Sequence, residues 1–394
     1  MPISREEYAA RLHNVRARMT EQNLAAILVS DPANLYYLIG YNAWSFYTPQ
    51  FLFVPASGDM IFYSRAMDAF GAFRTAWLPP ENIVGYPEHY VHHGEIHPFD
   101  WVAGDLRERG LVSPIAGEQV GLDLDAHFFS PKAYRSLVQG LPEWDFVDSH
   151  ELVNWVRLIK SPAEIDLMRA ASRVCTEAMN AAIEHVRVGA RQCDVAAEIS
   201  RAQAAGTAEF GGDYPAIVPM MPTGQAADTP HLTWNSEPFE DHQAVIVELA
   251  GAHKRYHTPL ARTIMLGKPS KRLQKVAGAV GEGLEAVLDL VRPGILATEL
   301  SEAWDITLAK HGYQKPSRLG YSIGIGYPPD WGERTVSLRS GEQTELQENM
   351  TFHLICGMWM DNYGYEVSEP FRVSADGVET FTDFPRELIQ KGNE

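Results

Sequence analysis

The residues best suited to acid–base chemistry are concentrated between His231 and Thr263. The run Val245–Leu249 is short, apolar and β-branched, which is typical of a buried strand, yet it contains the carboxylate of Glu248. His231 precedes Glu248 by 17 residues, and an Arg-Thr pair follows on a second extended segment, Tyr256–Met265. Histidine can accept and return a proton near neutral pH, and a carboxylate can bind a cation or act as a nucleophile. This spacing predicts a polar site on a sheet.

The spacing resembles that of the pita-bread hydrolases, the family of methionine aminopeptidase, aminopeptidase P, prolidase and creatinase. The peptidases of this family hold two metal ions with two Asp, one His and two Glu. Carried onto this sequence, those five positions fall on Glu248, Pro259, Tyr321, Ile355 and Glu369. His231 matches the family's proton-shuttling histidine, and Arg262–Thr263 match the Arg-Thr pair that follows the second Asp. The resemblance implies an N-terminal creatinase-like α/β domain followed by a C-terminal pita-bread catalytic domain.

Proline and isoleucine have no side-chain ligand atom, and two carboxylates with one phenol do not replace five metal ligands. The sequence therefore predicts a member of the family without a metal or another cofactor. Facing carboxylates at Glu248 and Glu369 would repel each other unless one takes a proton or a cation lies between them. Amidinium and guanidinium ions pair with carboxylates through two N–H groups, so we expect a small cationic substrate.

Loss of the metals also removes the usual source of hydroxide at neutral pH. His231 could then act as general base and general acid on a water molecule. Alternatively, Glu248 could attack an amidine carbon and form a covalent intermediate. The sequence leaves both routes open, with His231, Glu248 and Glu369 as the catalytic candidates.

A closer resemblance, over nearly the whole chain, is to the ectoine-hydrolase subgroup of this family. The shared strings are DPANxxYLxGYxxWSFY (31–47), PHLTWN (230–235), ELAGxxxRYHxPLART (248–263) and IGYPPDWGE (325–333). The resemblance implies hydrolysis of a C–N bond in the cyclic amidine of ectoine, and of hydroxyectoine, to an N-acetyl-diaminobutyrate. It also implies a homodimer.

Further side chains are expected to bind the substrate. Tyr321 replaces the metal histidine, and the resemblance implies that Trp44 or Tyr47 caps the active site of the partner subunit. Arg334 could bind a carboxylate, since its guanidinium offers two parallel N–H groups. The remaining candidates are His257, Asp330, Trp331 and Arg262. Several of these candidates also have a structural explanation. The aromatic residues could be core or dimer contacts, Arg334 could be a surface arginine, and Arg262 could only hold Glu248 in place.

Composition excludes several classes of function. With 394 residues, 45% of them hydrophobic, the chain can form two domains with large cores. The net charge of −18 argues against nucleic-acid and anionic-membrane partners. Three cysteines without metal-like spacing indicate a reduced compartment. The charged N-terminus does not resemble a secretory signal, and no apolar run is long enough to span a membrane, so we expect a cytoplasmic protein.

Alternation of helical and strand patterns predicts an α/β domain over residues 1–155. A second domain, 156–394, is expected to begin its first helix at Ser161-Pro162, where Glu164 completes a capping box. Helices are predicted at 4–22, 162–187, 191–206, 270–290 and 297–312, and a strand at 216–219. Four histidines between residues 89 and 97 lack the framework of carboxylates that a metal site would need and are interpreted as a polar loop.

Three other functions remain open from the sequence. A creatinase-like hydrolase could act on another guanidino or amidino compound. A divergent Xaa-Pro peptidase could keep an altered metal site. A pita-bread domain could also serve as a binding module without turnover.

Overall fold

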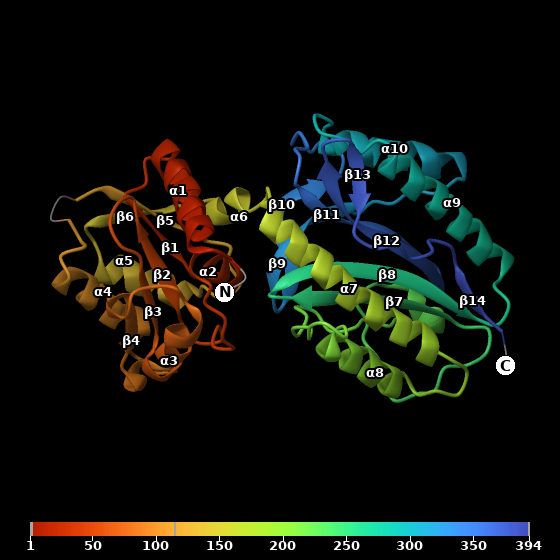
Figure 1. Cartoon of the computed structure of the whole chain (residues 1–394), viewed down its shortest axis with the longest axis horizontal. Helices are drawn as coiled ribbons and strands as arrows, with labels where there is room; N and C mark the ends of the chain where they lie inside the picture. Colours follow the sequence, from red (N-terminus) through yellow and green to blue (C-terminus); the bar gives the residue numbers. More distant parts are fainter. Residues whose placement is uncertain (1–2, 114–115, 393–394) are drawn as a thin grey trace. The chain divides into compact units, whose positions relative to one another are not determined.

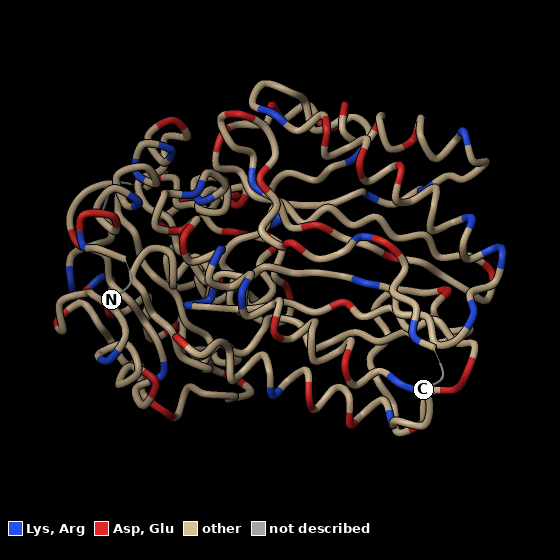
Figure 2. Tube along the Cα trace, turned by 45° about the vertical axis from the view of Figure 1, so that its right-hand side comes forward, with Lys and Arg blue, Asp and Glu red and all other residues tan. Residues whose placement is uncertain are grey.

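The computed structural model describes residues 3–113 and 116–392. They form two units, Met1–Arg157 and Leu158–Glu394, with a boundary two residues after the expected one at 155/156. Lysine and arginine residues are interspersed with acidic residues along the trace of both units (Figure 2). Among these described residues, no helix has the length and apolar character needed to cross a bilayer. Cys175, Cys193 and Cys356 are free thiols.

Unit 1 is an α/β domain, as predicted, built on a six-stranded sheet of order β4-β3-β2-β1-β5-β6 (Figure 1). Its strands are β1 (Ala26–Val29), β2 (Phe51–Pro55), β3 (Ile61–Arg65), β4 (Ile83–Tyr86), β5 (Glu118–Leu122) and β6 (Trp144–Asp148). Its α-helices are α1 (Arg5–Glu21), α2 (Pro32–Ile39), α3 (Ala66–Thr75), α4 (Pro98–Glu108), α5 (Pro131–Gly140) and α6 (Leu152–Val156). Two short 3-10 helices, η1 (Pro80–Asn82) and η2 (Glu88–Tyr90), flank β4.

Unit 2 begins with the helix that the capping pattern predicts. Ser161 accepts a hydrogen bond from the backbone N–H of Glu164, and the Glu164 side chain accepts one from the N–H of Ser161, which together form a capping box. The α-helices are α7 (Pro162–His185), α8 (Gln192–Ala205), α9 (Lys271–Leu288) and α10 (Ala297–Lys310), and η3 (Gly224–Asp228) is a 3-10 turn. The four predicted helices of this unit are thus confirmed to within two residues at each end.

The sheet of unit 2 has eight strands in the order β13-β12-β11-β9-β8-β14, with β7 paired to β8 and β10 to β9. These strands are β7 (Ala244–His253), β8 (Tyr256–Leu266), β9 (Gly320–Tyr327), β10 (Asp330–Leu338), β11 (Thr351–Met360), β12 (Tyr363–Ser374), β13 (Gly377–Thr380) and β14 (Ile389–Lys391). Helix α7 packs on β7 and β8, and α8 packs on α7 and β7 (Figure 1). Helix α9 packs on β11 and β12, and α10 packs on α9 and β10.

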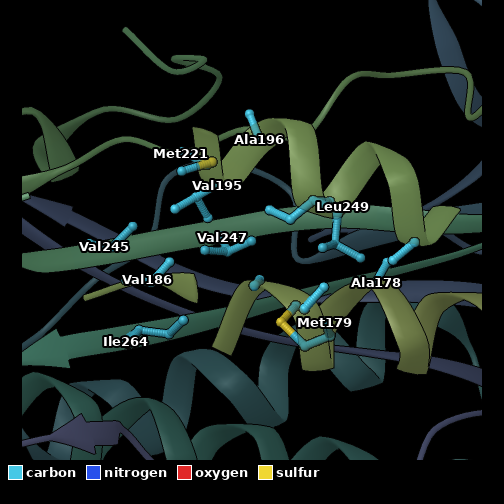
Figure 3. Close-up of a cluster of buried hydrophobic side chains, with 14 of the residues drawn as sticks. Ala178, Met179, Val186, Val195, Ala196, Met221, Val245, Val247, Leu249 and Ile264 are labelled. Carbon is cyan, nitrogen blue, oxygen red and sulfur yellow. The ribbon is translucent and has the colours of Figure 1, made fainter. Parts of the chain in front are cut away.

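A buried apolar cluster fixes the orientation of β7. Val245, Val247 and Leu249 pack with Met179 of α7 and Val195 of α8 (Figure 3). Because side chains alternate along a strand, the residues between them point to the opposite face of the sheet. The face of β7 that carries Glu248 is therefore turned away from the helices.

The predicted strand at 216–219 is wrong. This segment forms no ladder, and only the adjoining Met220 makes an isolated bridge, to Glu248. Prolines at 215, 219 and 222 remove backbone N–H donors, so a continuous strand cannot form.

Candidate active site

A cavity of about 800 Å³ opens on the helix-free face of β7. Strands β7, β9, β10, β11 and β12 line it, together with the loops that precede β7 and β9. The charged and aromatic residues of its wall are His231, Glu248, Lys315, Arg318, Tyr321, Asp330, Trp331, Trp359 and Glu366. The structure therefore brings together five of the predicted residues, His231, Glu248, Tyr321, Asp330 and Trp331. It adds four that the sequence did not indicate, Lys315, Arg318, Trp359 and Glu366.

Glu248 is 6% exposed and is held from both sides by backbone pairing. It lies opposite Ala261 of β8, and its N–H and C=O both bond to Met220 of the incoming loop. Burial raises the pKa of the Glu248 carboxyl well above its ordinary value, and the carboxylates of Glu366 and Asp330 raise it further. A neutral acid is thus favoured at this position while the cavity holds no cation.

Glu366 supplies the second buried carboxylate of the cavity. It lies on β12 opposite Gly357 of β11 and is 2% exposed. Its Oε1 atom has no hydrogen-bond partner, although a buried carboxylate oxygen normally has one. Burial raises the pKa of Glu366, while the Lys315 ammonium opposes that shift. Two acidic groups with raised pKa values in one cavity can share a proton or accept a cation.

Tyr321 stands between these acids and a buried histidine. The Trp331 indole N–H donates to its hydroxyl over 2.8 Å, and His353 Nδ1 lies 3.4 Å from the same oxygen. His353 Nε2 is 2.7 Å from Ser368 Oγ, which accepts from the N–H of Ala261. Burial lowers the pKa of His353 to about 3, so this imidazole is neutral. Burial and then Glu248 raise the pKa of Tyr321, so its phenol keeps its proton and can donate it.

His231 reaches the cavity from the loop after η3, and its side chain is exposed. Its φ of 67° lies in the left-handed region, which a non-glycine residue adopts at an energetic cost. The strained backbone is consistent with a side chain that the loop holds in a required direction. An exposed imidazole at the rim can exchange protons with both solvent and cavity.

Two cations line another part of the wall. Lys315 is 8% exposed, and its ammonium lies 4.5 Å from the Trp359 ring centroid. Arg318 is exposed and stacks on Tyr321, with its guanidinium carbon 4.3 Å from the ring centroid. In the described part of the chain, neither forms an ion pair; each donates one hydrogen bond to a serine hydroxyl, of Ser317 and Ser337 respectively. The cavity thus carries charges of both signs.

Glu369 does not face Glu248, so this part of the sequence prediction is wrong. Its side chain receives a hydrogen bond from Arg262 Nη2 over 2.5 Å and one from Thr382 Oγ1 over 3.2 Å. Both partners of the Arg262–Glu369 ion pair are fully buried. Positions 366 and 369 are an odd number of residues apart on β12, so their side chains leave the strand on opposite faces. Arg262 holds Glu369, not Glu248, and it does not line the cavity.

His257 and Arg334 also lie outside the cavity wall. The buried His257 ring accepts from the N–H of Ala216 through Nε2, and its Nδ1 is 2.8 Å from the carbonyl of Arg255. Burial lowers the pKa of His257 well below its ordinary value, so the ring is neutral and both of its nitrogens are used. His257 therefore holds the 216 segment in place. Arg334 is half-buried on β10 with a φ of 57°.

Trp44 and Tyr47 belong to unit 1. They are 58% and 56% exposed, and the Trp44 ring lies tilted against that of Phe46, with ring centroids 5.1 Å apart. Exposed aromatic side chains of this size are available for a contact outside their own unit. Their role as a cap on a substrate remains a prediction.

The missed residues had weak sequence signals. Glu366 precedes the motif at Glu369 by three positions. Strand alternation places the two on opposite faces, but only the pairing of β12 with β11 shows that Glu366 shares the face of Ile355. Lys315 and Arg318 lie in a Lys-Pro-Ser-Arg turn just before β9, which resembles an ordinary charged loop. His353 is an isolated histidine in an apolar strand, for which a core position is the usual expectation.

Comparison with known proteins agrees with this architecture. Residues 166–375 match metallopeptidase family M24, and residues 11–159 match the creatinase/prolidase N-terminal domain. The ectoine hydrolase of Halomonas elongata is 42% identical over 99% of both chains. The crystal structure of a prolidase from Thermococcus sibiricus superposes with a TM-score of 0.82 at 20% identity, over 98% of this chain and 99% of that one. A dipeptidase from Pyrococcus horikoshii gives a TM-score of 0.80 at 21% identity, over 97% and 100%.

The family name implies metal ions, but the residues present here do not fit a two-metal site. The positions that correspond to the ligands include Pro259, which pairs with Ala250, and Ile355, which lines the cavity without a donor atom. Glu369, the fifth of these positions, is bound to Arg262. Within residues 3–113 and 116–392, no three His, Cys, Asp or Glu side chains are grouped so that they could hold an ion.

We expect Glu369→Leu to destabilise unit 2 by about 3–5 kcal/mol, because it leaves the Arg262 guanidinium buried without its partner. Urea denaturation followed by tryptophan fluorescence measures this change, and Glu387→Gln, an exposed acid of the same unit, is the control. A loss below about 1 kcal/mol, the range of exposed pairs, would contradict a buried structural pair.

Glu248→Gln should have the opposite effect. Burial raises the pKa of Glu248 in the folded protein above its value in the unfolded chain, which is near 4.3. The free energy of unfolding therefore falls as the pH rises from the unfolded pKa through the folded pKa. Removing the charge should therefore stabilise the protein at neutral and alkaline pH, by about 1.4 kcal/mol for each unit of the shift, and leave it unchanged in acid. Denaturation midpoints measured against pH should separate the variant from wild type only above the unfolded pKa.

Proposed function

Since the chain belongs to metallopeptidase family M24 and carries a creatinase/prolidase N-terminal domain, we propose that this enzyme hydrolyses the cyclic amidine ring of ectoine, without a metal ion, to an N-acetyl-diaminobutyrate. The observation that carries the proposal is the pair of buried acids, Glu248 and Glu366, which share one cavity with His231. The identity to the Halomonas elongata ectoine hydrolase, over almost the full length of both chains, supports the choice of substrate.

The two acids supply a binding site for an amidinium ion. An unpaired buried carboxylate is costly, and a planar cation with N–H groups on two sides satisfies two such carboxylates at once. Tyr321 keeps its phenolic proton and offers a neutral donor beside them. The substrate cation would thus occupy the place that dications occupy in the metallopeptidases of the family.

The reaction needs one C–O bond to form and one C–N bond to break. Water adds to the ring carbon between the two nitrogens, with His231 as the base that takes its proton. The tetrahedral carbon then expels one ring nitrogen, to which His231 returns the proton, and the acetyl group stays on the other nitrogen. In the second route the Glu248 carboxylate adds to the same carbon, and one ring nitrogen leaves with a proton from the His231 imidazolium. Water, deprotonated by His231, then cleaves the bond between that carbon and Glu248, and the acetyl group stays on the other nitrogen. Both routes use the carboxylate form of Glu248.

Hydroxyectoine, which adds one hydroxyl to the same ring, is proposed as a second substrate, since the cavity of about 800 Å³ exceeds the size of either molecule. The homodimer and the cytoplasmic location that the sequence suggests remain predictions.

Incubation of ectoine with chelator-treated protein should yield an acetylated diaminobutyrate, detected by mass spectrometry. His231→Gln should lower kcat about 100- to 10,000-fold, the range for loss of a general base. Glu248→Gln and Glu366→Gln should reduce kcat/KM at least as strongly, because each removes a partner of the substrate cation. Glu387→Gln, an exposed acid outside the cavity, serves as the control.

Activity that chelation abolishes and added metal restores would overturn metal independence. Absence of the product under all conditions would overturn the assignment of ectoine. Turnover of a guanidino compound in its place would favour a creatinase-like reaction.

Binding of ectoine should strengthen as the pH rises. The acids bind a cation only when ionised, and their raised pKa values mean that the free cavity still holds a proton in the neutral range. Each ligand bound should then release up to two protons, one from each acid, and Kd should fall by at most about 100-fold per pH unit while both acids are protonated and about tenfold while one is. Calorimetry of His231→Gln in buffers of different ionisation enthalpy measures the release, and a Kd that stays constant between about pH 5 and 9 would contradict it.

A further inference from the structure

We propose that Arg318, with Lys315 beside it, binds the carboxylate of the substrate, so that the cavity selects cyclic amidinium ions that also carry a carboxylate. This inference rests on the proposed function, which uses the acids of the cavity. The positive charges in the same cavity are an independent observation, because a site for a simple cation would not need them. Lys315 and Arg318 line the same cavity as Glu248 and Glu366.

Arg318 is held in a defined position but is not saturated. Its guanidinium stacks on the Tyr321 ring, and Nη1 donates to Ser337 Oγ over 3.2 Å. In the part of the chain that the structure describes, it has no carboxylate partner. A guanidinium has five N–H donors in a planar fork, so a pair of them remains for a carboxylate. The stacking limits the rotamers of the side chain, which reduces the entropy lost on binding.

Lys315 adds a second positive charge that the protein buries without neutralising. Its ammonium donates to Ser317 Oγ over 2.8 Å and lies over the Trp359 ring. Burial lowers its pKa, and Glu366 opposes that effect. Trp359 also lines the cavity, and its indole N–H has no hydrogen-bond partner. A buried ammonium and an unpartnered indole N–H are both donors that an anionic group would satisfy.

Tyr321 lies close to charges of both signs. One face of its ring carries Arg318, and its hydroxyl lies at the Trp331 side, where Glu248 and Asp330 raise its pKa. A ligand that lies along this ring meets Glu248 and Asp330 near the hydroxyl and Arg318 at the ring face. A small zwitterion with a ring amidinium and a carboxylate matches this combination of charges, whereas an amidine without a carboxylate leaves Arg318 without an anionic partner.

The test combines two substrates with two forms of the enzyme. Ectoine is compared with 2-methyl-1,4,5,6-tetrahydropyrimidine, the same ring without the carboxylate, in wild type and in Arg318→Gln. We expect Arg318→Gln to raise KM for ectoine about 10- to 100-fold, the range for a hydrogen-bonded charge pair, and to change kcat/KM for the analogue by less than about threefold. Arg339→Gln, an exposed arginine outside the cavity, is the matched control and should alter neither substrate.

Three results would overturn the carboxylate site. Equal losses for both substrates in Arg318→Gln would mean that the arginine acts only by positioning Tyr321. Equal kcat/KM values for the two substrates in wild type would mean that the carboxylate is not recognised. A variant with unchanged kinetics for ectoine would remove Arg318 from the site.

Failure of the proposed function gives a different pattern. If wild type hydrolyses neither compound, calorimetry with both compounds still tests the site. Binding that requires the carboxylate and is lost in Arg318→Gln would support the carboxylate site, although the proposal that the enzyme hydrolyses ectoine would be wrong. Binding of neither compound, or of both with equal affinity, would overturn it.

Discussion

The main constraint on unit 2 is the burial of carboxylates away from water without a counter-charge. Glu248 and Glu366 are buried side by side in one cavity, and neither forms an ion pair with another described residue. In a medium of low polarity, two such groups cannot both stay ionised without a counter-charge. These two acids therefore need a proton or a cation. A cationic ligand that binds between them offsets the free-energy cost of their burial.

The scaffold around the cavity is built to withstand this cost. Strand β7 is paired with β8 along its whole length and packed on α7 and α8 through Val245, Val247 and Leu249. Arg262 donates to four backbone carbonyls as well as to Glu369, which ties β8 to β12 and to the segment before β14. Such a framework holds the side chains in place while the acids change protonation, which is what preorganised binding requires.

Local patterns made much of this architecture predictable. Ser161 and Glu164 indicated the start of α7 because a capping box depends only on neighbouring residues. The apolar run around Glu248 indicated β7, and the match of His231 to Glu248 indicated two residues that line one cavity. These features are set by short-range hydrogen bonds and by side-chain periodicity, both of which are written directly in the sequence.

The choice between Glu366 and Glu369 was not predictable in this way. Both are glutamates of β12, both are buried, and they are three positions apart. Their environments differ because Arg262, more than 100 residues earlier, approaches one face of the strand and not the other. Motif matching aligned the chain on the paired glutamate, because a motif records residue type and order but not the face of the strand.

The same reasoning explains why the cationic wall was missed. Lys315 and Arg318 become significant only when the fold places them in one cavity with two acids, since in the sequence they are charged residues of a turn. A site formed by strands from both ends of a domain is specified by long-range packing, and its charge balance can be read only after that packing is known. In this protein the charges of the cavity wall say more about the ligand than the sequence motif does. Acidic and basic side chains without ion-pair partners require a ligand that carries charges of both signs. A metal ion would supply only the positive charge that the acids need. A small zwitterion also supplies a negative charge for Lys315 and Arg318.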